Sequence, residues 1–334
     1  MDTFLSLLKQ SYNSGKPLVG PLSASVPLTS RCNSRCLYCP PSRTRKEKEP
    51  SLVQLKELFK QLANLGVHFI SLTGGEPTLR SDLEEIVMAA RESRLIPSLL
   101  TNGTLLTEAR VVSLISAGIQ GFVVSLDSTS PQTYRAIRGV SVMPVLEAID
   151  ILARIRNDHD GIFACVTSVI TKHNFRDLPT LATNLIQRGL HYQIQPVLNQ
   201  PQVSLDPNDQ TAMDALRNVV DSVLDIYSTR YTLAEKRYTK AIHQYISSGR
   251  LPHEFSCLGM FLLVHMDVEF NVYPCWLFPT IGSAKMHEIA DLWNSDKMHA
   301  ARMKLKEEGC PGCWLLCDAK PSLQYQLEEV FNEN

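Results

Sequence analysis

The sequence predicts an α/β protein built on a partial, TIM-like (β/α)6 barrel with a smaller region after it. Apolar strand-like segments alternate with helical stripes between residues 24 and 197, and polar residues recur where those strands end. The chain then turns polar and proline-rich over 201–207. We expect four parts: an N-terminal extension over 1–23, the barrel over 24–205, bridging helices over 206–250, and a C-terminal region over 251–334.

Charge and composition exclude several classes of protein. The 33 basic and 34 acidic residues leave a formal net charge of −1, which argues against general nucleic-acid binding because that requires a basic face. No apolar run reaches the roughly 20 residues of a membrane helix, and the N-terminus carries no basic leader. We therefore expect a cytoplasmic protein, whose nine cysteines serve as metal ligands more readily than as disulfides.

The first predicted strand, 24–28, leads directly into three closely spaced thiols. Cys32, Cys36 and Cys39 are separated by three and then two residues, and a proline follows. Thiolates gathered in a short loop are ligands that iron prefers, so the loop predicts an iron–sulfur cluster. No further cysteine occurs before Cys165, which would leave one iron open to a substrate or cofactor. A zinc site or three unrelated cysteines are the alternatives.

Two features beside the thiols have open interpretations. The ring of Tyr38 could cover the cluster or stack on a bound base, or it could be an ordinary half-buried aromatic. The mixed charge run over 42–50 could contact an anionic substrate group or an acidic electron donor, or it could form a solvated loop.

The next strand ends in a glycine-rich turn. A helical stripe over 51–65 stops at Gly66, and a strand over 67–72 follows it. The strand runs into Thr-Gly-Gly-Glu-Pro, in which Gly74 and Gly75 allow a ligand to approach the backbone. Backbone carbonyls and the Glu76 carboxylate could accept hydrogen bonds from an ammonium group.

Four further strands and four helices continue the alternation. Ser81 and Glu84 form a possible capping box at the start of one helix. The predicted helices are 81–94, 107–117, 143–156 and 178–188. The predicted strands are 97–101, 122–126, 163–170 and 192–197. Cys165 stands alone in an apolar strand and is expected to be a buried core thiol.

Polar side chains fall at or near the carboxyl ends of these strands, where a parallel barrel places its site. They are Asn102, Ser125, Asp127, Thr167, Ser168 and Gln195. Capping or turn formation is the alternative role for each of them.

The three-cysteine loop and the Gly-Gly-Glu-Pro turn together resemble the radical S-adenosylmethionine enzymes, whose motif is C-x-x-x-C-x-x-C followed by such a turn. The resemblance implies that Cys32, Cys36 and Cys39 bind a [4Fe–4S] cluster whose open iron holds S-adenosylmethionine. It also implies that the turn, Gly74, Gly75 and Glu76, holds the amino group of that cofactor. Reductive cleavage would then give a 5′-deoxyadenosyl radical that abstracts a substrate hydrogen.

The segment from Ser125 to Gly139 is similar to the strand-four motif of the same family. By that likeness Ser125 and Asp127 lie near the ribose, and Arg138 lies near the methionyl carboxylate. Ser128 replaces the usual glycine. The remaining residues expected around the cofactor are Tyr38, Asn102 and Ser168.

The C-terminal region carries a second cysteine group after two amphipathic stripes, 213–227 and 238–245. Strands 261–266 and 269–273 predict a hairpin, 289–293 is part of a short helix, and the cysteines are Cys257, Cys275, Cys310, Cys313 and Cys317. The pattern resembles the SPASM module, or its half-length twitch version, and implies one auxiliary [4Fe–4S] cluster. We expect Cys257, Cys275 and two of the last three as ligands. A structural zinc site with four cysteine ligands remains the alternative, and no histidine is assigned to a metal.

These features favour a radical enzyme that acts on a small molecule, such as a sugar, nucleoside or cyclitol, in a biosynthetic pathway. An electron donor such as flavodoxin or ferredoxin would be its partner. The second hypothesis is a peptide-modifying maturase. It is disfavoured because only about twenty-five residues precede the first strand, which leaves little room for a leader-binding domain. A non-catalytic metal-binding protein is the third hypothesis.

Overall fold

The computed structural model describes residues 2–39, 49–158, 161–252 and 255–326. Its centre is one nine-stranded sheet with the order β6-β5-β4-β3-β2-β1-β7-β8-β9. The strands are β1 Ser23–Thr29, β2 Phe69–Gly74, β3 Ile96–Thr101, β4 Gly121–Ser125, β5 Phe163–Ile170, β6 His191–Pro196, β7 Leu263–Met266, β8 Asn271–Tyr273 and β9 Gly282–Ser283.

Helices surround this sheet. They are α1 Asp2–Ser14, α2 Leu52–Leu65, α3 Leu83–Glu92, α4 Glu108–Ala117, α5 Pro131–Arg138, α6 Met143–Asp158, α7 Leu178–Gln187, α8 Gln210–Ile226, α9 Leu233–Ser248, α10 Gly259–Leu262, α11 Ile289–Trp293, α12 Asp296–Glu308 and α13 Leu316–Tyr325. Two 3-10 turns, Pro77–Leu79 and Phe175–Asp177, complete the described elements. No helix of the described ranges is long and apolar enough to cross a bilayer.

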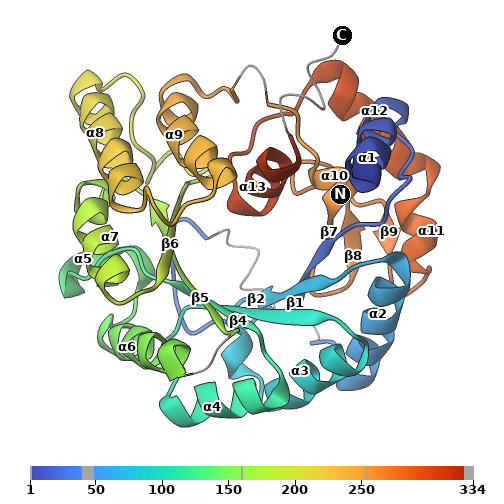
Figure 1. Ribbon diagram of the computed structural model, residues 1–334, viewed down its shortest axis with the longest axis horizontal. Coiled ribbons are helices and arrows are strands. Elements are labelled where there is room, and N and C mark those ends of the chain that lie inside the picture. The colour runs from blue at the N-terminus through green and yellow to red at the C-terminus, as the bar shows by residue number, and fades with distance from the viewer. Residues whose placement is uncertain (1, 40–48, 159–160, 253–254, 327–334) are drawn as a thin grey trace.

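The first six strands form the predicted partial barrel. All neighbours from β1 to β6 pair in parallel, and each connection carries at least one helix on the outside of the curved sheet (Figure 1). The barrel does not close, because α9 and α13 stand between β6 and β7 (Figure 1). The parallel α/β class and the partial barrel are therefore as the sequence predicts.

Local capping signals explain where the outer helices begin and end. Ser51 and Gln54 form a capping box at the start of α2, and Gly66 ends that helix in a left-handed conformation. The capping box predicted at Ser81 and Glu84 is wrong. The helix α3 begins after Asp82, whose carboxylate instead binds the Arg80 guanidinium at 2.6 and 2.8 Å.

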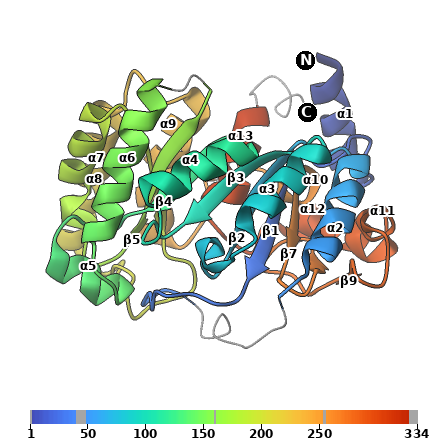
Figure 2. The ribbon, with the colours of Figure 1, turned by 90° about the horizontal axis from the view of Figure 1, so that it is seen from below.

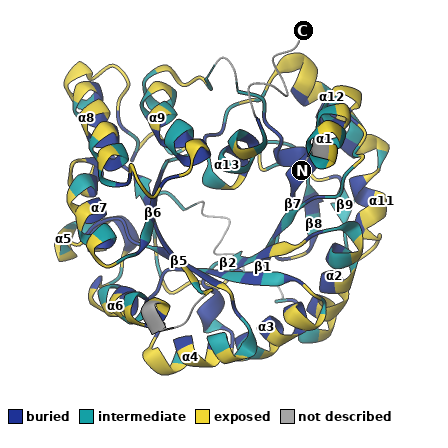
Figure 3. Ribbon diagram, in the orientation of Figure 1, coloured by how far each residue is buried: buried dark blue, intermediate teal, exposed yellow. Residues whose placement is uncertain are grey.

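The core lies between the sheet and its outer helices. Along the strands, residues that face the helices are buried, whereas the alternate residues face the inside of the barrel and remain partly exposed. Ser25, Ser71 and Ser98 stand in register on β1, β2 and β3 on this inner side. Figure 3 shows the same division on the helices, which are exposed outward and buried toward the sheet. The inner surface of the barrel therefore carries these serines beside partly exposed apolar residues such as Leu100 and Val123.

The C-terminal hairpin continues the barrel sheet. The sequence predicts the hairpin but not its partner: β7 pairs in parallel with β1, with His265 opposite Ser25, and β7 and β8 pair antiparallel. Phe261, predicted in the first strand, belongs to α10. The prediction also lacks α1, α5, α12 and α13.

Candidate functional site

The Gly-Gly-Glu-Pro turn lies directly against the backbone of the cysteine loop. Gly75 N donates to Thr29 O at 2.7 Å, and Glu76 N donates to Arg31 O at 2.8 Å. A Cβ on Gly75 would lie 2.1 Å from Arg31 O, so any side chain there would displace the loop. Gly74 has φ 124°, and a Cβ on it would lie 2.4 Å from Thr29 O. The parallel pairing of β1 and β2 brings these two motifs together at the carboxyl-terminal ends of the two strands (Figure 2).

The Glu76 carboxylate shapes this turn from within. The side chain is fully buried. One of its oxygens accepts hydrogen bonds from Thr78 N at 3.0 Å, Thr78 Oγ1 at 2.6 Å and Thr101 Oγ1 at 2.7 Å, and the other accepts from Asn102 N at 2.7 Å. Each carboxylate oxygen offers about two acceptor positions, so three donors crowd one oxygen and a single donor binds the other. The buried side chain thus holds the turn together, and the ammonium contact predicted for it stays a prediction.

Asn102 holds the cysteine loop from the end of β3. Its Nδ2 donates to Asn33 Oδ1 at 2.6 Å and to Ser34 Oγ at 3.1 Å. Asn33 in turn donates to Thr104 Oγ1 at 2.8 Å. The predicted site residue Asn102 thus contacts the loop between Cys32 and Cys36, where it orients backbone carrying the thiols.

The short helix α5 clamps the other half of the loop. Arg35 N donates to Arg138 O and Leu37 N to Ile137 O, both at 2.9 Å. This helix was not predicted from the sequence, although its ends carry clear signals. Ser130 caps it, Pro131 is its first residue and Gly139 ends it in a left-handed conformation.

Asp127 joins the loop to the barrel at the end of β4. It is fully buried, and its carboxylate accepts from Tyr38 Oη at 2.7 Å, Arg138 Nε at 2.6 Å and Val169 N at 2.8 Å. The ribose contact predicted for Asp127 does not fit a carboxylate that is enclosed in this way. The fold brings Tyr38 and Arg138, which were also predicted to lie at the cofactor site, into contact with this carboxylate.

The remaining predicted residues divide between the two faces of the sheet. Ser125 and Thr167 are partly exposed and in register on the inner face. Ser168 is fully buried. It accepts from Tyr192 Oη at 2.9 Å and donates to Leu126 O, so a cofactor contact is at odds with its position. Gln195 accepts from Leu316 N at 3.4 Å, and Cys165 is buried as predicted.

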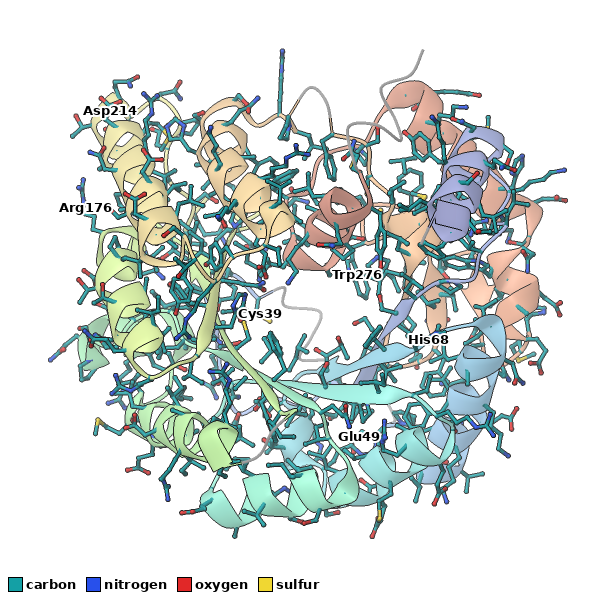
Figure 4. All side chains as sticks on the ribbon, viewed as in Figure 1. Cys39, Glu49, His68, Arg176, Asp214 and Trp276 are labelled. Carbon is teal, nitrogen blue, oxygen red and sulfur yellow. The ribbon has the colours of Figure 1, made fainter. Side chains whose placement is uncertain are left out.

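The three thiols of the first loop suit an iron–sulfur cluster by type and spacing. Cys32 is exposed, while Cys36 and Cys39 are half-buried, and Cys39 lies inside the ring of strands (Figure 4). Burial raises the pKa of Cys36 to about 11, although Arg138 opposes the rise. Iron binding would therefore release a proton from this thiol. Among the described residues no three Cys, His, Asp or Glu side chains converge on one position suited to a single metal ion, whereas cluster thiolates bind separate irons. The charge run over 42–50 lies mostly outside the described residues.

The C-terminal cysteines gather around one buried carboxylate, which the sequence analysis misses. Asp318 accepts from Cys317 Sγ at 3.1 Å and lies 2.9 Å from His265 Nε2. A hydrogen bond from the Cys257 thiol holds the pKa of Cys310 below its usual value. All nine cysteines lie within the described ranges, and none is in a disulfide. The signal for Asp318 is its place directly after the last cysteine.

Trp276 stands beside these cysteines on the inner side of the sheet (Figure 4). Its ring packs edge-on against the His265 ring, with 5.3 Å between the centroids, and is tilted against the Tyr273 ring, with 5.7 Å between the centroids. It nevertheless remains 44% exposed, whereas Trp293 and Trp314 are almost fully buried. Trp276 therefore offers a fixed aromatic surface to the inside of the barrel, a feature that sequence analysis does not identify.

Comparisons with known proteins identify the domain that carries the first site. Residues 26–182 match the family described as the Radical SAM superfamily. The chain is 38% identical over 124 residues to a PqqA peptide cyclase of Rhizobium meliloti, which covers 36% of this chain and 33% of that protein. It is 39% identical over 125 residues to a GTP 3′,8-cyclase of Stenotrophomonas maltophilia, with 36% and 38% covered. The chain thus spans little more than a third of the length of these relatives.

The fold is shared over a larger part of the chain. SuiB of Streptococcus suis, solved with its precursor peptide SuiA, superposes with a TM-score of 0.67 at 15% identity, covering 87% of this chain and 68% of SuiB. Sequence match and fold together show that this chain carries a radical SAM domain within residues 26–182, and the family and its cyclase relatives indicate an enzyme.

Proposed function

We propose that this enzyme cleaves S-adenosylmethionine at a [4Fe–4S] cluster held by Cys32, Cys36 and Cys39. The observation that carries the proposal is the direct hydrogen bonding between the Gly74–Gly75 turn and the backbone that leads into Cys32. The family implies both cofactors. The donor set of three thiolates fits a cluster that keeps one iron for a small-molecule ligand.

A cluster held by these thiolates would supply the electron for reductive cleavage of S-adenosylmethionine and thereby the hydrogen-abstraction chemistry of the family. The chain supplies position and enclosure. We assign the amino group of the cofactor to backbone carbonyls of the turn and to the Glu76 carboxylate, which four protein donors hold in place. Asn102 and the end of α5 hold the cysteine loop from opposite sides.

The substrate site is proposed on the inner surface of the barrel. Ser25, Ser71 and Ser98 provide hydrogen-bonding groups there, and Trp276 provides an apolar face. A small molecule such as a sugar, nucleoside or cyclitol suits these hydroxyl groups and the aromatic face. A peptide substrate is supported about equally, since the relatives include a peptide cyclase as well as a nucleotide cyclase and SuiB binds a precursor peptide.

A second [4Fe–4S] cluster is proposed at the C-terminal cysteines. Cys257, Cys275, Cys310 and Cys313 would be its four ligands. The Cys317 thiol donates to Asp318 instead, which makes it the spare thiol. Four protein ligands would close this cluster and give it an electron-relay or structural role. A structural zinc ion on the same four thiolates is the competing assignment.

The wider assignments of the chain remain proposals of the same kind. The divisions at 23, 205 and 250 separate the extension, barrel, bridge and auxiliary-cluster region. The electron donor is proposed to be a small redox protein such as flavodoxin or ferredoxin, and the enzyme is assigned to the cytoplasm.

The test of the proposed activity uses protein purified and reconstituted without oxygen. With a strong reductant it should convert S-adenosylmethionine to 5′-deoxyadenosine, slowly even without substrate. Replacement of Cys32, Cys36 and Cys39 by alanine should abolish this and lower the iron content from about eight to about four per chain. Cleavage by the triple variant would refute the assignment, and zinc in place of the second four irons would refute the auxiliary cluster.

A further inference from the structure

Arg138 is a buried cation beside the first cysteine loop. It is only 5% exposed, and its Nε donates to Asp127 Oδ2 at 2.6 Å. Its guanidinium carbon lies 5.6 Å from the ring centroid of Tyr38 and 5.9 Å from that of Tyr134. The two rings help to exclude water from the ion pair, so its charges are screened less than those of a surface pair.

The same guanidinium faces a predicted cluster ligand. Arg138 Nη1 lies 4.0 Å from Cys36 Sγ. The position is fixed from two directions, because the Arg138 carbonyl accepts from Arg35 N at 2.9 Å while its side chain is held by Asp127. Cys36, Arg138 and Asp127 therefore form a row in which a cation separates a thiol from a carboxylate.

Charges at such a place act on the redox equilibrium of a cluster. Reduction adds one negative charge, and the potential of an iron–sulfur cluster depends on net charge, hydrogen bonds to sulfur and solvent exposure. A cation near a ligand sulfur favours the reduced form, and a carboxylate opposes it. Both effects are strong where the local dielectric is low.

We propose that Arg138 and Asp127 form an opposed charge pair that sets the reduction potential of the cluster at Cys32, Cys36 and Cys39. Arg138 raises the potential toward the range of a cellular donor, and Asp127 lowers it while holding Arg138 in place. This inference rests on the proposed cluster. It assigns both residues a role in electron acceptance, separate from any contact with S-adenosylmethionine.

The test is a redox titration of the reconstituted full-length protein, followed by electron paramagnetic resonance without S-adenosylmethionine. Loss of a signal in Cys36→Ala identifies the N-terminal cluster. Arg138→Gln should reduce the ratio of reduced to oxidised cluster at a fixed potential at least tenfold, which is about 59 mV for a one-electron couple. Asp127→Asn should raise that ratio, and the double variant should return close to the wild-type value.

The exposed Arg135, on the same helix, provides the matched control, and Arg135→Gln should leave the ratio unchanged. Opposite shifts for the two charge variants distinguish charge from structural damage, which would not reverse its sign. Equal potentials in Arg138→Gln and Arg135→Gln would overturn the inference. If Arg138→Gln fails to load iron, Asp127→Asn and the charge-retaining Arg138→Lys decide. A tenfold fall in the ratio of reduced to oxidised cluster in either variant refutes the inference. Absence of the N-terminal cluster from the wild type refutes the proposed function instead.

Discussion

A single methyl group on Gly75 should separate the two halves of the cofactor site. The Cβ of Gly75→Ala would lie 2.1 Å from Arg31 O and 2.6 Å from Arg31 C, whereas ordinary contact begins at 3.4 Å. Because both obstacles are backbone atoms, the loop must move by about an ångström. Overpacking costs about 1–3 kcal/mol, and the two backbone hydrogen bonds of the turn contribute about 1 kcal/mol each. We expect the free energy of unfolding to fall by about 3–5 kcal/mol.

The displaced loop should also lose iron, because Arg31 immediately precedes Cys32 and a site tolerates displacements of only about 0.5 Å. Urea denaturation of the protein without iron measures the stability, and iron content after anaerobic reconstitution measures the site. Gly121→Ala is the control, since the nearest atom to its Cβ would be the Ser98 side chain, at 3.3 Å. Wild-type stability together with a full iron content in Gly75→Ala would refute the close packing of turn on loop.

Three further results are expected. Glu76→Gln should weaken S-adenosylmethionine binding, measured by equilibrium dialysis, while keeping iron, because the amide accepts fewer of the four donors; unchanged affinity would contradict this. Burial alone would raise the pKa of Glu235, but hydrogen bonds from His191 and the Thr232 backbone hold it below the usual 4.5. Glu235→Gln should therefore cost about 2 kcal/mol at pH 7, a difference that shrinks as the pH falls below 4.5 in urea titrations; a pH-independent difference would exclude the mechanism. Cys317→Ala should retain the full iron content and Cys313→Ala should not, and the reverse pattern would show that Cys317 is a ligand.

The strands and outer helices could be predicted because their signals are local. Short apolar segments marked the strands, and Thr107 and Gly118 marked both ends of α4. The pairing of β7 with β1 could not be predicted, since it joins residues far apart in the sequence and nothing local specifies it. The helix α12 lacks a clear apolar stripe in the sequence because the charged Arg302 lies on its buried face. The guanidinium carbon of Arg302 is 4.6 Å from the centroid of the Trp293 ring.

The candidate site was predictable at the level of motifs. The cysteine loop and the Gly-Gly-Glu-Pro turn follow parallel neighbouring strands, so their meeting follows from topology. The partners of individual polar side chains were not predictable. Asp127 and Ser168 stand at or near strand ends like Ser125, but only the folded chain shows that protein groups already satisfy them.

The parallel pairing of β7 with β1 has a consequence for how the two cysteine sites can vary. Ser23–Ser25 of β1 pair with 263–265 on one side and with β2 on the other, so the first loop grows from an interior strand. A protein cut before β7 would leave β1 as an exposed edge with unpaired backbone groups, a surface prone to association with other chains. The second site is thus not an appendage on a flexible tether. Its spacing from the first is fixed by the same backbone ladder, and an insertion that lengthened the connecting chain would leave that spacing unchanged.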